Sequence, residues 1–187
     1  MKNFLEHIKK LSSLKDEEIP SLKDITRVRS YEKGSKIVKM SEINRKLYFI
    51  DEGMLKVSFF KDDREFVMNF FSQHEFCAVL DSLVNDQPSN YVITAIANVS
   101  LTEIDYPKLN KLAARYQSFE QINSRLTAMA TGHMMNRIRE LLEADATERY
   151  RNFIEKKGHL LNLISLKDLA GYLGISQVSL SRIRAKK

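Results

Sequence analysis

The sequence predicts an α+β fold in which a β-rich domain, a long helix and two short terminal helices follow one another. Three observations predict it. Apolar residues alternate in short runs between residues 31 and 105, they recur at helical spacing after Pro107, and two helix-capping sequences lie near the C-terminus. With 187 residues, 43% of them apolar, the chain is long enough for one or two domains with their own cores. Its composition is not that of a disordered or low-complexity chain.

The first 28 or so residues are expected to be helical, because their apolar residues share one face, and a second short segment follows within this stretch. That face comprises Phe4, Leu5, Ile8, Leu11 and Leu14.

Six apolar or alternating runs follow, with the sequences KIVKM, KLYFI, GMLKVSFF, EFVMNFF, NYVITAIA and VSLTEI. They are typical of strands, and residues 33–34, 51–53, 61–63 and 85–88 have the composition of turns. Within the third run, Leu55 and Val57 are expected on one face, and Lys56 and Ser58 on the other. So many short, closely spaced strands predict a β-barrel or jelly roll.

The segment from about residue 117 to residue 144 contains no Pro and predicts a helix of roughly 40 Å. Its apolar residues form a continuous stripe, which must be covered. One interpretation is packing against the chain's own β domain; the other, which we favour, is a seam with a second copy of the chain. The residues assigned to this dimer helix are Phe119, Ile122, Leu126, Met129 and Met134, and the stripe continues through Ile138, Leu141 and Leu142.

Charge divides unevenly along the chain. Residues 1–107 carry 15 Lys and Arg against 17 Asp and Glu, a net −2, whereas residues 108–187 carry 15 against 7, a net +8. The C-terminal part is therefore expected to meet a polyanion, although a solvated basic helical surface would give the same count.

Cysteine and histidine usage restricts the chemistry. The single cysteine, Cys77, excludes an internal disulfide, a four-thiolate iron–sulfur cluster and a Cys-rich zinc site, and favours a reducing, cytoplasmic location. No two of the four histidines are two residues apart, and no phosphate-binding loop or nucleophile elbow is present, so an enzyme is not expected. No metal, haem or other cofactor is expected either. The apolar runs are too short to span a membrane.

The last 23 residues, SLKDLAGYLGISQVSLSRIRAKK, predict a helix-turn-helix. Ser165 is a suitable N-cap with Asp168 three residues later, Gly174 suits a left-handed helix end, and Ser176 caps the second helix. Leu180 and Ile183 face inward. The residues expected to contact DNA present hydroxyls, an amide, cations and one apolar contact; they are Ser165, Ser176, Gln177, Val178, Ser179, Ser181, Arg182, Arg184, Lys186 and Lys187.

The chemistry of that helix suits double-stranded DNA. Gln177 can pair with adenine and Arg182 with guanine, and Val178 can contact a thymine methyl group. The serines and the basic end suit phosphates, which position the protein without reading sequence.

Four motifs accompany this order of elements: YEKGSKIV at residues 31–38, LYFIDEGMLKV at 47–57, NDQPSNY at 85–91 and LAGYLGISQVSLSRIR at 169–184. With them the chain resembles the Crp/Fnr family of bacterial transcription regulators. The resemblance looks like one to a short branch common in Bacteroidetes. It implies a cyclic-nucleotide-binding-like jelly roll over residues 1–107, connecting and dimerisation helices over 108–145, and a DNA-binding helix-turn-helix over 146–187.

The resemblance also locates the effector pocket. Relatives that bind cyclic AMP hold its ribose with Gly-Glu and its phosphate with Arg and a small hydroxyl residue; here these positions fall on Ala78, Val79, Ser89 and Asn90. Because a buried phosphate without an arginine is an uncompensated charge, cyclic AMP is not the expected effector. The pocket is expected to be vacant or adapted to an unknown small molecule.

The resemblance is weaker at the C-terminus. The base-reading positions fall on Gln177, Val178 and Arg182, where the catabolite activator has Arg, Glu and Arg, so a different DNA sequence is expected. The printed sequence reaches Lys187 without the β-hairpin wing of most relatives, which predicts fewer phosphate contacts. The alternative function is a ligand-binding or protein-interaction module whose helix-turn-helix does not bind DNA.

Overall fold

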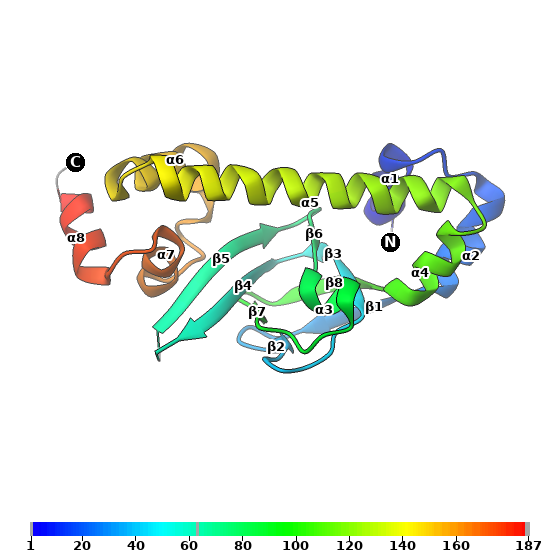
Figure 1. The fold of residues 1–187 in the computed structure, drawn as a ribbon, viewed down its shortest axis with the longest axis horizontal. Helices are drawn as coiled ribbons and strands as arrows, with labels where there is room; N and C mark the ends of the chain where they lie inside the picture. The colour runs from blue at the N-terminus through cyan, green and yellow to red at the C-terminus, as the bar shows by residue number, and fades with distance from the viewer. Residues whose placement is uncertain (1, 63, 186–187) are drawn as a thin grey trace.

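The computed structural model describes residues 2–62 and 64–185 and has helical ends on either side of a β domain (Figure 1). The N-terminal end consists of α1 (Lys2–Leu11), the 3₁₀ turn η1 (Asp16–Glu18) and α2 (Ile19–Asp24). These helices pack beside α4 (Tyr106–Ala113) and the start of α5 (Gln117–Glu143).

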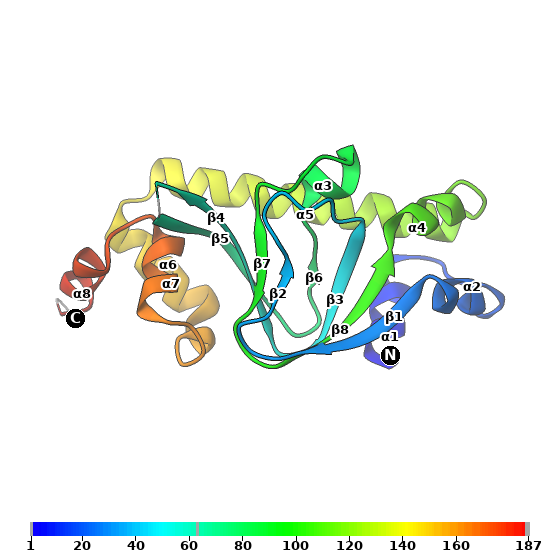
Figure 2. The same cartoon turned by 90° about the horizontal axis from the view of Figure 1, so that it is seen from below.

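The β domain consists of two four-stranded antiparallel sheets (Figure 2). One sheet has the order β1 (Thr26–Tyr31), β8 (Val99–Asp105), β3 (Lys46–Glu52) and β6 (Phe76–Cys77). The other has the order β2 (Lys36–Val38), β7 (Val92–Ala95), β4 (Met54–Lys61) and β5 (Arg64–Ser72). A short helix, α3 (Leu80–Asn85), lies in the connection between β6 and β7. The predicted β domain is thus confirmed.

One local prediction needs correction, and one short helix was missed. The N-terminal helical region ends at Asp24 and not near residue 28, because β1 begins at Thr26 and pairs with β8 along its whole length. This strand lies at a sheet edge and most of its residues are exposed, so it lacks the apolar alternation that marks the other strands. The helix α3 was also not predicted.

The C-terminal end consists of α6 (Ala146–Lys157), the 3₁₀ turn η2 (Gly158–Leu160), α7 (Leu166–Leu173) and α8 (Gln177–Ala185). Between the two ends, α5 runs beside the β domain, as both views show (Figures 1 and 2). The long helix predicted over residues 117–144 is confirmed.

Buried apolar residues form three clusters. One fills the space between the sheets and includes Val38, Tyr48, Leu55 and Ile93. A second lies among α1, β3, α4 and the start of α5. The third joins the β4–β5 hairpin to α6, α7 and α8. The C-terminal helices therefore share a hydrophobic core with the β domain.

Candidate nucleic-acid interface

The α7–α8 pair is shaped by its capping residues. The Ser165 hydroxyl accepts a hydrogen bond from the Asp168 backbone N–H at 3.0 Å, and the Ser176 hydroxyl accepts one from the Ser179 N–H at 3.1 Å. Between them, Gly174 has φ +70°, a left-handed conformation that a glycine adopts without strain. Leu180 is fully buried beneath the pair. With these caps and this turn, α8 lies beyond α7 at the C-terminal end of the molecule (Figure 1).

The outer face of α8 is open to solvent. Gln177, Ser181, Arg182 and Arg184 are exposed, and Val178 is 62% exposed. Ser165 and Ser176 are also exposed, and Ser179 is half-buried. Lys186 and Lys187 lie outside the described residues. The described candidates therefore lie on α8 or directly before it, except Ser165, which lies at the start of α7.

That surface has the polarity that a polyanion requires. Residues 174–185 contain no Asp or Glu, and the exposed amide, hydroxyl and guanidinium groups are the donors that read base edges and hold phosphates.

The end of α7 is held by arginines from the two preceding helices. Arg137 of α5 donates to the Tyr172 carbonyl, and its guanidinium lies 3.9 Å from the centre of the Tyr172 ring. Arg149 of α6 donates from Nε to the Leu173 carbonyl at 3.0 Å. Both cations therefore satisfy carbonyls at the negative end of α7, which fixes this helix against α5 and α6.

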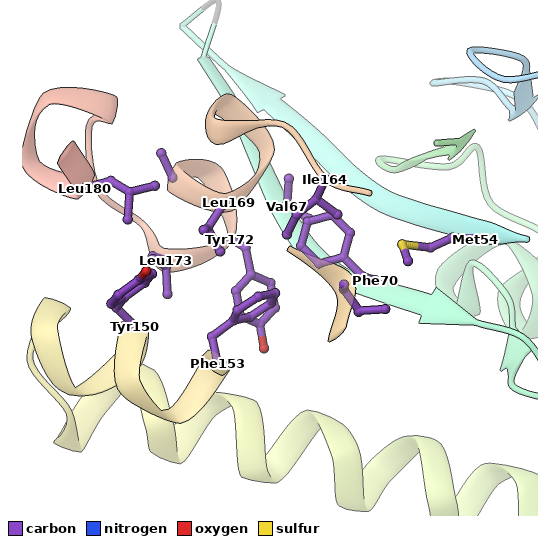
Figure 3. Packing of buried hydrophobic residues seen from close by; sticks show 12 residues of the cluster. Met54, Val67, Phe70, Tyr150, Phe153, Ile164, Leu169, Tyr172, Leu173 and Leu180 are labelled. Atoms are coloured by element: carbon purple, nitrogen blue, oxygen red, sulfur yellow. The ribbon is translucent and has the colours of Figure 1, made fainter. Parts of the chain in front are cut away.

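The third core cluster is also held by α6. Phe70 of β5 is fully buried, with ring centres 6.3 Å from Phe153 and 5.6 Å from Tyr172 (Figure 3). The Lys157 ammonium donates to Asn69 Oδ1 at 2.7 Å and to the Phe70 carbonyl at 3.1 Å. Burial lowers the pKa of Lys157. Sequence reasoning did not identify these contacts, because no local pattern links α6 to a strand 88 residues away.

The candidate effector residues lie close to Asp81, which sequence reasoning missed. Val79 is the buried N-cap of α3, and Asp81 accepts hydrogen bonds from the Ser82 N–H at 2.7 Å and from the Asn90 N–H at 3.3 Å. The Asn90 side-chain amide also donates to Asp81, at 3.4 Å. Three donors that could face an anion are thus already paired with a carboxylate of this chain.

The other two candidates take part in packing. Ala78 packs against the N-terminal cluster, whereas Ser89 is buried and its hydroxyl donates to the Tyr91 carbonyl at 2.8 Å. Between the sheets, buried side chains that include Cys77 fill the interior, and burial raises the pKa of the Cys77 thiol. The region therefore combines a packed interior with a negative charge at its edge.

The apolar stripe of α5 divides into two parts. Phe119 and Ile122 are fully buried in the cluster with α1, and Leu126 is half-buried against it. Met129 and Met134 are exposed. The stripe continues beyond them with exposed residues: Met135, Ile138, Leu141 and Leu142. The first half of the stripe therefore packs on the chain itself, as the first interpretation expects. Its second half has no cover within the described residues, and the seam with a second copy stays a prediction.

Comparisons with known proteins agree with this architecture. Residues 28–116 match the cyclic nucleotide-binding domain family. Over 110 residues the chain is 31% identical to a cAMP-dependent protein kinase regulatory subunit from Debaryomyces hansenii, a match covering 59% of this chain and 24% of that protein. The chain thus spans about a quarter of the length of this curated relative.

Solved structures resemble the chain over most of its length. FixK2 from Bradyrhizobium japonicum has a TM-score of 0.75 at 19% identity, covering 87% of this chain and 84% of that one. A putative Crp/Fnr-family transcriptional regulator from Eubacterium rectale has a TM-score of 0.75 at 16% identity, covering 91% and 82%. The chain has the Crp/Fnr fold. The Xanthomonas campestris regulator CLP is a further example, with a TM-score of 0.70 at 18% identity and coverage of 92% and 91%.

The Crp/Fnr resemblance of the sequence is therefore confirmed at the level of the fold, while the narrower Bacteroidetes branch stays a prediction. Two of these structural neighbours, CLP and the Eubacterium rectale protein, are described as regulators. Across residues 2–62 and 64–185, no helix combines the length and apolar character needed to cross a membrane. The same residues contain no group of three or more His, Cys, Asp or Glu suited to a metal ion.

Proposed function

We propose that this chain is a DNA-binding transcription regulator of the Crp/Fnr type that acts as a homodimer. The observation that carries the proposal is the outer face of α8, which is exposed, free of acidic residues and rich in hydrogen-bond donors. A capped, firmly packed helix with such a face is the part of a helix-turn-helix that enters the major groove. In this assignment the α7–α8 pair binds DNA, and the β domain and α5 hold this pair in position.

The exposed half of the α5 stripe supports the homodimer. Met134, Ile138 and Leu141 follow one another at helical spacing on α5, and Leu142 is 82% exposed. Burying such side chains stabilises an interface by about 1.5–3 kcal/mol each when burial is complete. A second copy is the occupant we propose, because one helix face repeated by two-fold symmetry gives a continuous coiled-coil-like seam.

A dimer through α5 would present two copies of α8 at the same end of the assembly. Two-fold helix-turn-helix proteins bind half-sites one helical turn apart, about 34 Å. The proposed target is therefore an inverted repeat, with Gln177 and Arg182 reading base edges and the serines contacting phosphates.

Control by cyclic AMP is not part of the proposal. Asp81 is a negative charge that already takes the Ser82 and Asn90 donors, and no arginine occupies the Ser89–Asn90 position. A phosphate brought to this place would meet a carboxylate and would lose hydration without compensation. Any effector that binds here would be a molecule without that phosphate.

Fluorescence anisotropy with a fixed duplex at about 50 mM salt tests the DNA-binding proposal. The duplex is one selected by the wild-type protein from a random pool. Arg182→Ala should weaken binding by about fivefold or more, because a good guanine pair contributes about 1–3 kcal/mol. Arg115→Ala is the matched control: it removes the same charge from an exposed residue in the turn between α4 and α5 and should change little, because this turn lies at the other end of α5 from α8 (Figure 1).

Equal affinities for wild type and Arg182→Ala would remove Arg182 from the interface. No binding to any duplex at this salt concentration would refute the DNA-binding function and favour a protein-interaction or ligand-binding module.

A further inference from the structure

The hairpin β4–β5 carries a buried cation that faces α7. Lys56 Nζ lies 2.8 Å from Glu65 Oε1, within the hairpin, and 2.5 Å from Asp168 Oδ1 on α7. The three side chains are 9%, 12% and 15% exposed. Burial opposes the charge of Lys56, but the hydrogen bonds to Asp168 and Glu65 outweigh it and raise its pKa. Lys56 therefore joins two carboxylates, from different units of the chain, that would otherwise repel each other.

The N-terminus of α7 depends on the same carboxylate. Asp168 Oδ2 accepts a hydrogen bond from the Ser165 hydroxyl at 2.7 Å, and Ser165 is the N-cap of α7. The ion pair with Lys56 is thus connected directly to the cap that begins this helix.

A glycine allows α7 to lie against the hairpin. A Cβ atom added at Gly171 would be 3.0 Å from the Glu65 carbonyl oxygen and 3.3 Å from Val67 Cγ2. The first distance involves backbone, which cannot turn away as a side chain can. A Cβ at this position would therefore require α7 or the strand to move by a few tenths of an ångström.

Apolar contacts complete the same surface. Figure 3 shows Val67 and Phe70 projecting from the hairpin toward Leu169 and Tyr172 of α7. On another side, the guanidinium of Arg137 from α5 lies over the Tyr172 ring. The helix α7 is thus held between the hairpin and α5, whereas the outer face of α8 remains exposed.

We propose that Lys56 is a positioning residue for DNA recognition, and that the β4–β5 hairpin sets the direction in which α8 points. The proposal rests on the proposed function. Two recognition helices on one duplex must keep a fixed separation and angle, and these are measured from the α5 seam. The hairpin contact fixes α7, and through it α8, relative to that seam without covering the surface that meets DNA.

Two variants loosen the contact from opposite sides. Lys56→Met removes the cation while keeping most of the length of the side chain, and leaves Glu65 and Asp168 as neighbouring, largely buried carboxylates without a cation between them. Gly171→Ala adds the methyl group that meets the hairpin, although alanine favours the α7 helix itself. Gly158→Ala is the matched control, because its added Cβ meets only Ile154 Cγ2, at an ordinary 3.7 Å.

The first readout needs no DNA. Spin labels are placed at Val28 of β1 and Val178 of α8, both exposed, in a Cys77→Val background. The labelled chain is mixed with an excess of unlabelled chain, so that each dimer carries at most one labelled protomer, and the separation of the two labels is measured by pulsed electron spin resonance. Wild type and Gly158→Ala should give one narrow distance distribution. Lys56→Met and Gly171→Ala should give broad or shifted ones. Unchanged distributions in both variants would overturn the proposal.

The second readout separates positioning from general stability. On the duplex selected by wild type, we expect native half-site spacing to be preferred over the same duplex with 5 inserted base pairs, about half a helical turn. The two variants should reduce this preference about tenfold while keeping the wild-type affinity for a single half-site. A loss of folded protein would instead weaken binding to every duplex equally, and that result would contradict a positioning role.

The two proposals can fail separately. If wild type selects no duplex, the DNA-binding function is refuted, and the distance distributions still decide whether the hairpin orients α8. If Lys56→Met does not fold, as judged by its thermal transition, Gly171→Ala decides alone.

Discussion

Replacing Phe70 by alanine is the most direct perturbation of the core that the β domain shares with the C-terminal helices. Phe70 is fully buried on β5, and its ring contacts those of Phe153 on α6 and Tyr172 on α7. Truncating a buried phenylalanine costs about 3–5 kcal/mol, from lost burial and from the cavity left behind. We expect a loss in this range, a large part of a typical total stability of about 5–15 kcal/mol.

The shared core is tested by whether Phe70→Ala destabilises the C-terminal helices more than an equally buried truncation elsewhere does. Urea unfolding gives the overall free energy, and hydrogen exchange of the α7 amides gives the free energy of opening the C-terminal helices. Phe119→Ala is the matched control, because Phe119 is equally buried but belongs to the N-terminal cluster. Phe70→Ala should accelerate exchange in α7 about 100-fold or more, since 1.36 kcal/mol corresponds to a factor of ten. Phe119→Ala should leave it near wild type.

A loss below about 1 kcal/mol in Phe70→Ala, or equal α7 exchange in the two variants, would refute the shared core. The C-terminal helices would then be an independent unit that only touches the hairpin.

Three further predictions follow. Replacing Ile138 and Leu142 together by Glu should convert the dimer to a monomer in analytical ultracentrifugation, because two charges would face a second copy across the apolar seam; a persistent dimer would contradict the α5 interface. Cyclic AMP at millimolar concentration should not shift the melting temperature, and a stabilising shift would contradict the account of Asp81. The Glu148 backbone N–H lowers the pKa of Asp145, so the folded chain gains stability above the ordinary carboxyl range and loses it as pH falls through the lowered pKa. Melting curves between pH 2 and 6 should therefore show a smaller acid loss in Asp145→Asn.

Elements with local signals were predicted from the sequence. The α7–α8 pair has the cap Ser165 and the left-handed Gly174 within ten residues, and its structure follows from them. The strands β3 and β4 have continuous or alternating apolar runs, and Leu55 faces the interior while Lys56 faces α7, as alternation requires. By contrast, β1 is an exposed edge strand, whose sequence TRVRSY gives little periodic signal.

Long-range contacts were beyond sequence reasoning. Helical periodicity gave the stripe of α5, but it could not show that Phe119 packs inside the chain while Ile138 does not, because the same spacing serves both. The pair formed by Lys56 and Asp168 joins residues 112 positions apart. The sequence assigned Asp168 to the start of its own helix and Lys56 to one face of its strand, and neither pattern indicates a contact between them. The sequence likewise did not indicate that Asp81 accepts a hydrogen bond from Asn90, because this contact forms only in the fold.

Selection of bound duplexes from a random pool, by the full chain at fixed salt, measures whether two copies of α8 bind one duplex together. We expect enrichment of an inverted repeat whose half-sites are centred about one helical turn, or 10–10.5 base pairs, apart. Recovery of no sequence preference, or of a single unrepeated site, would contradict a dimer that presents two copies of α8 to one face of DNA.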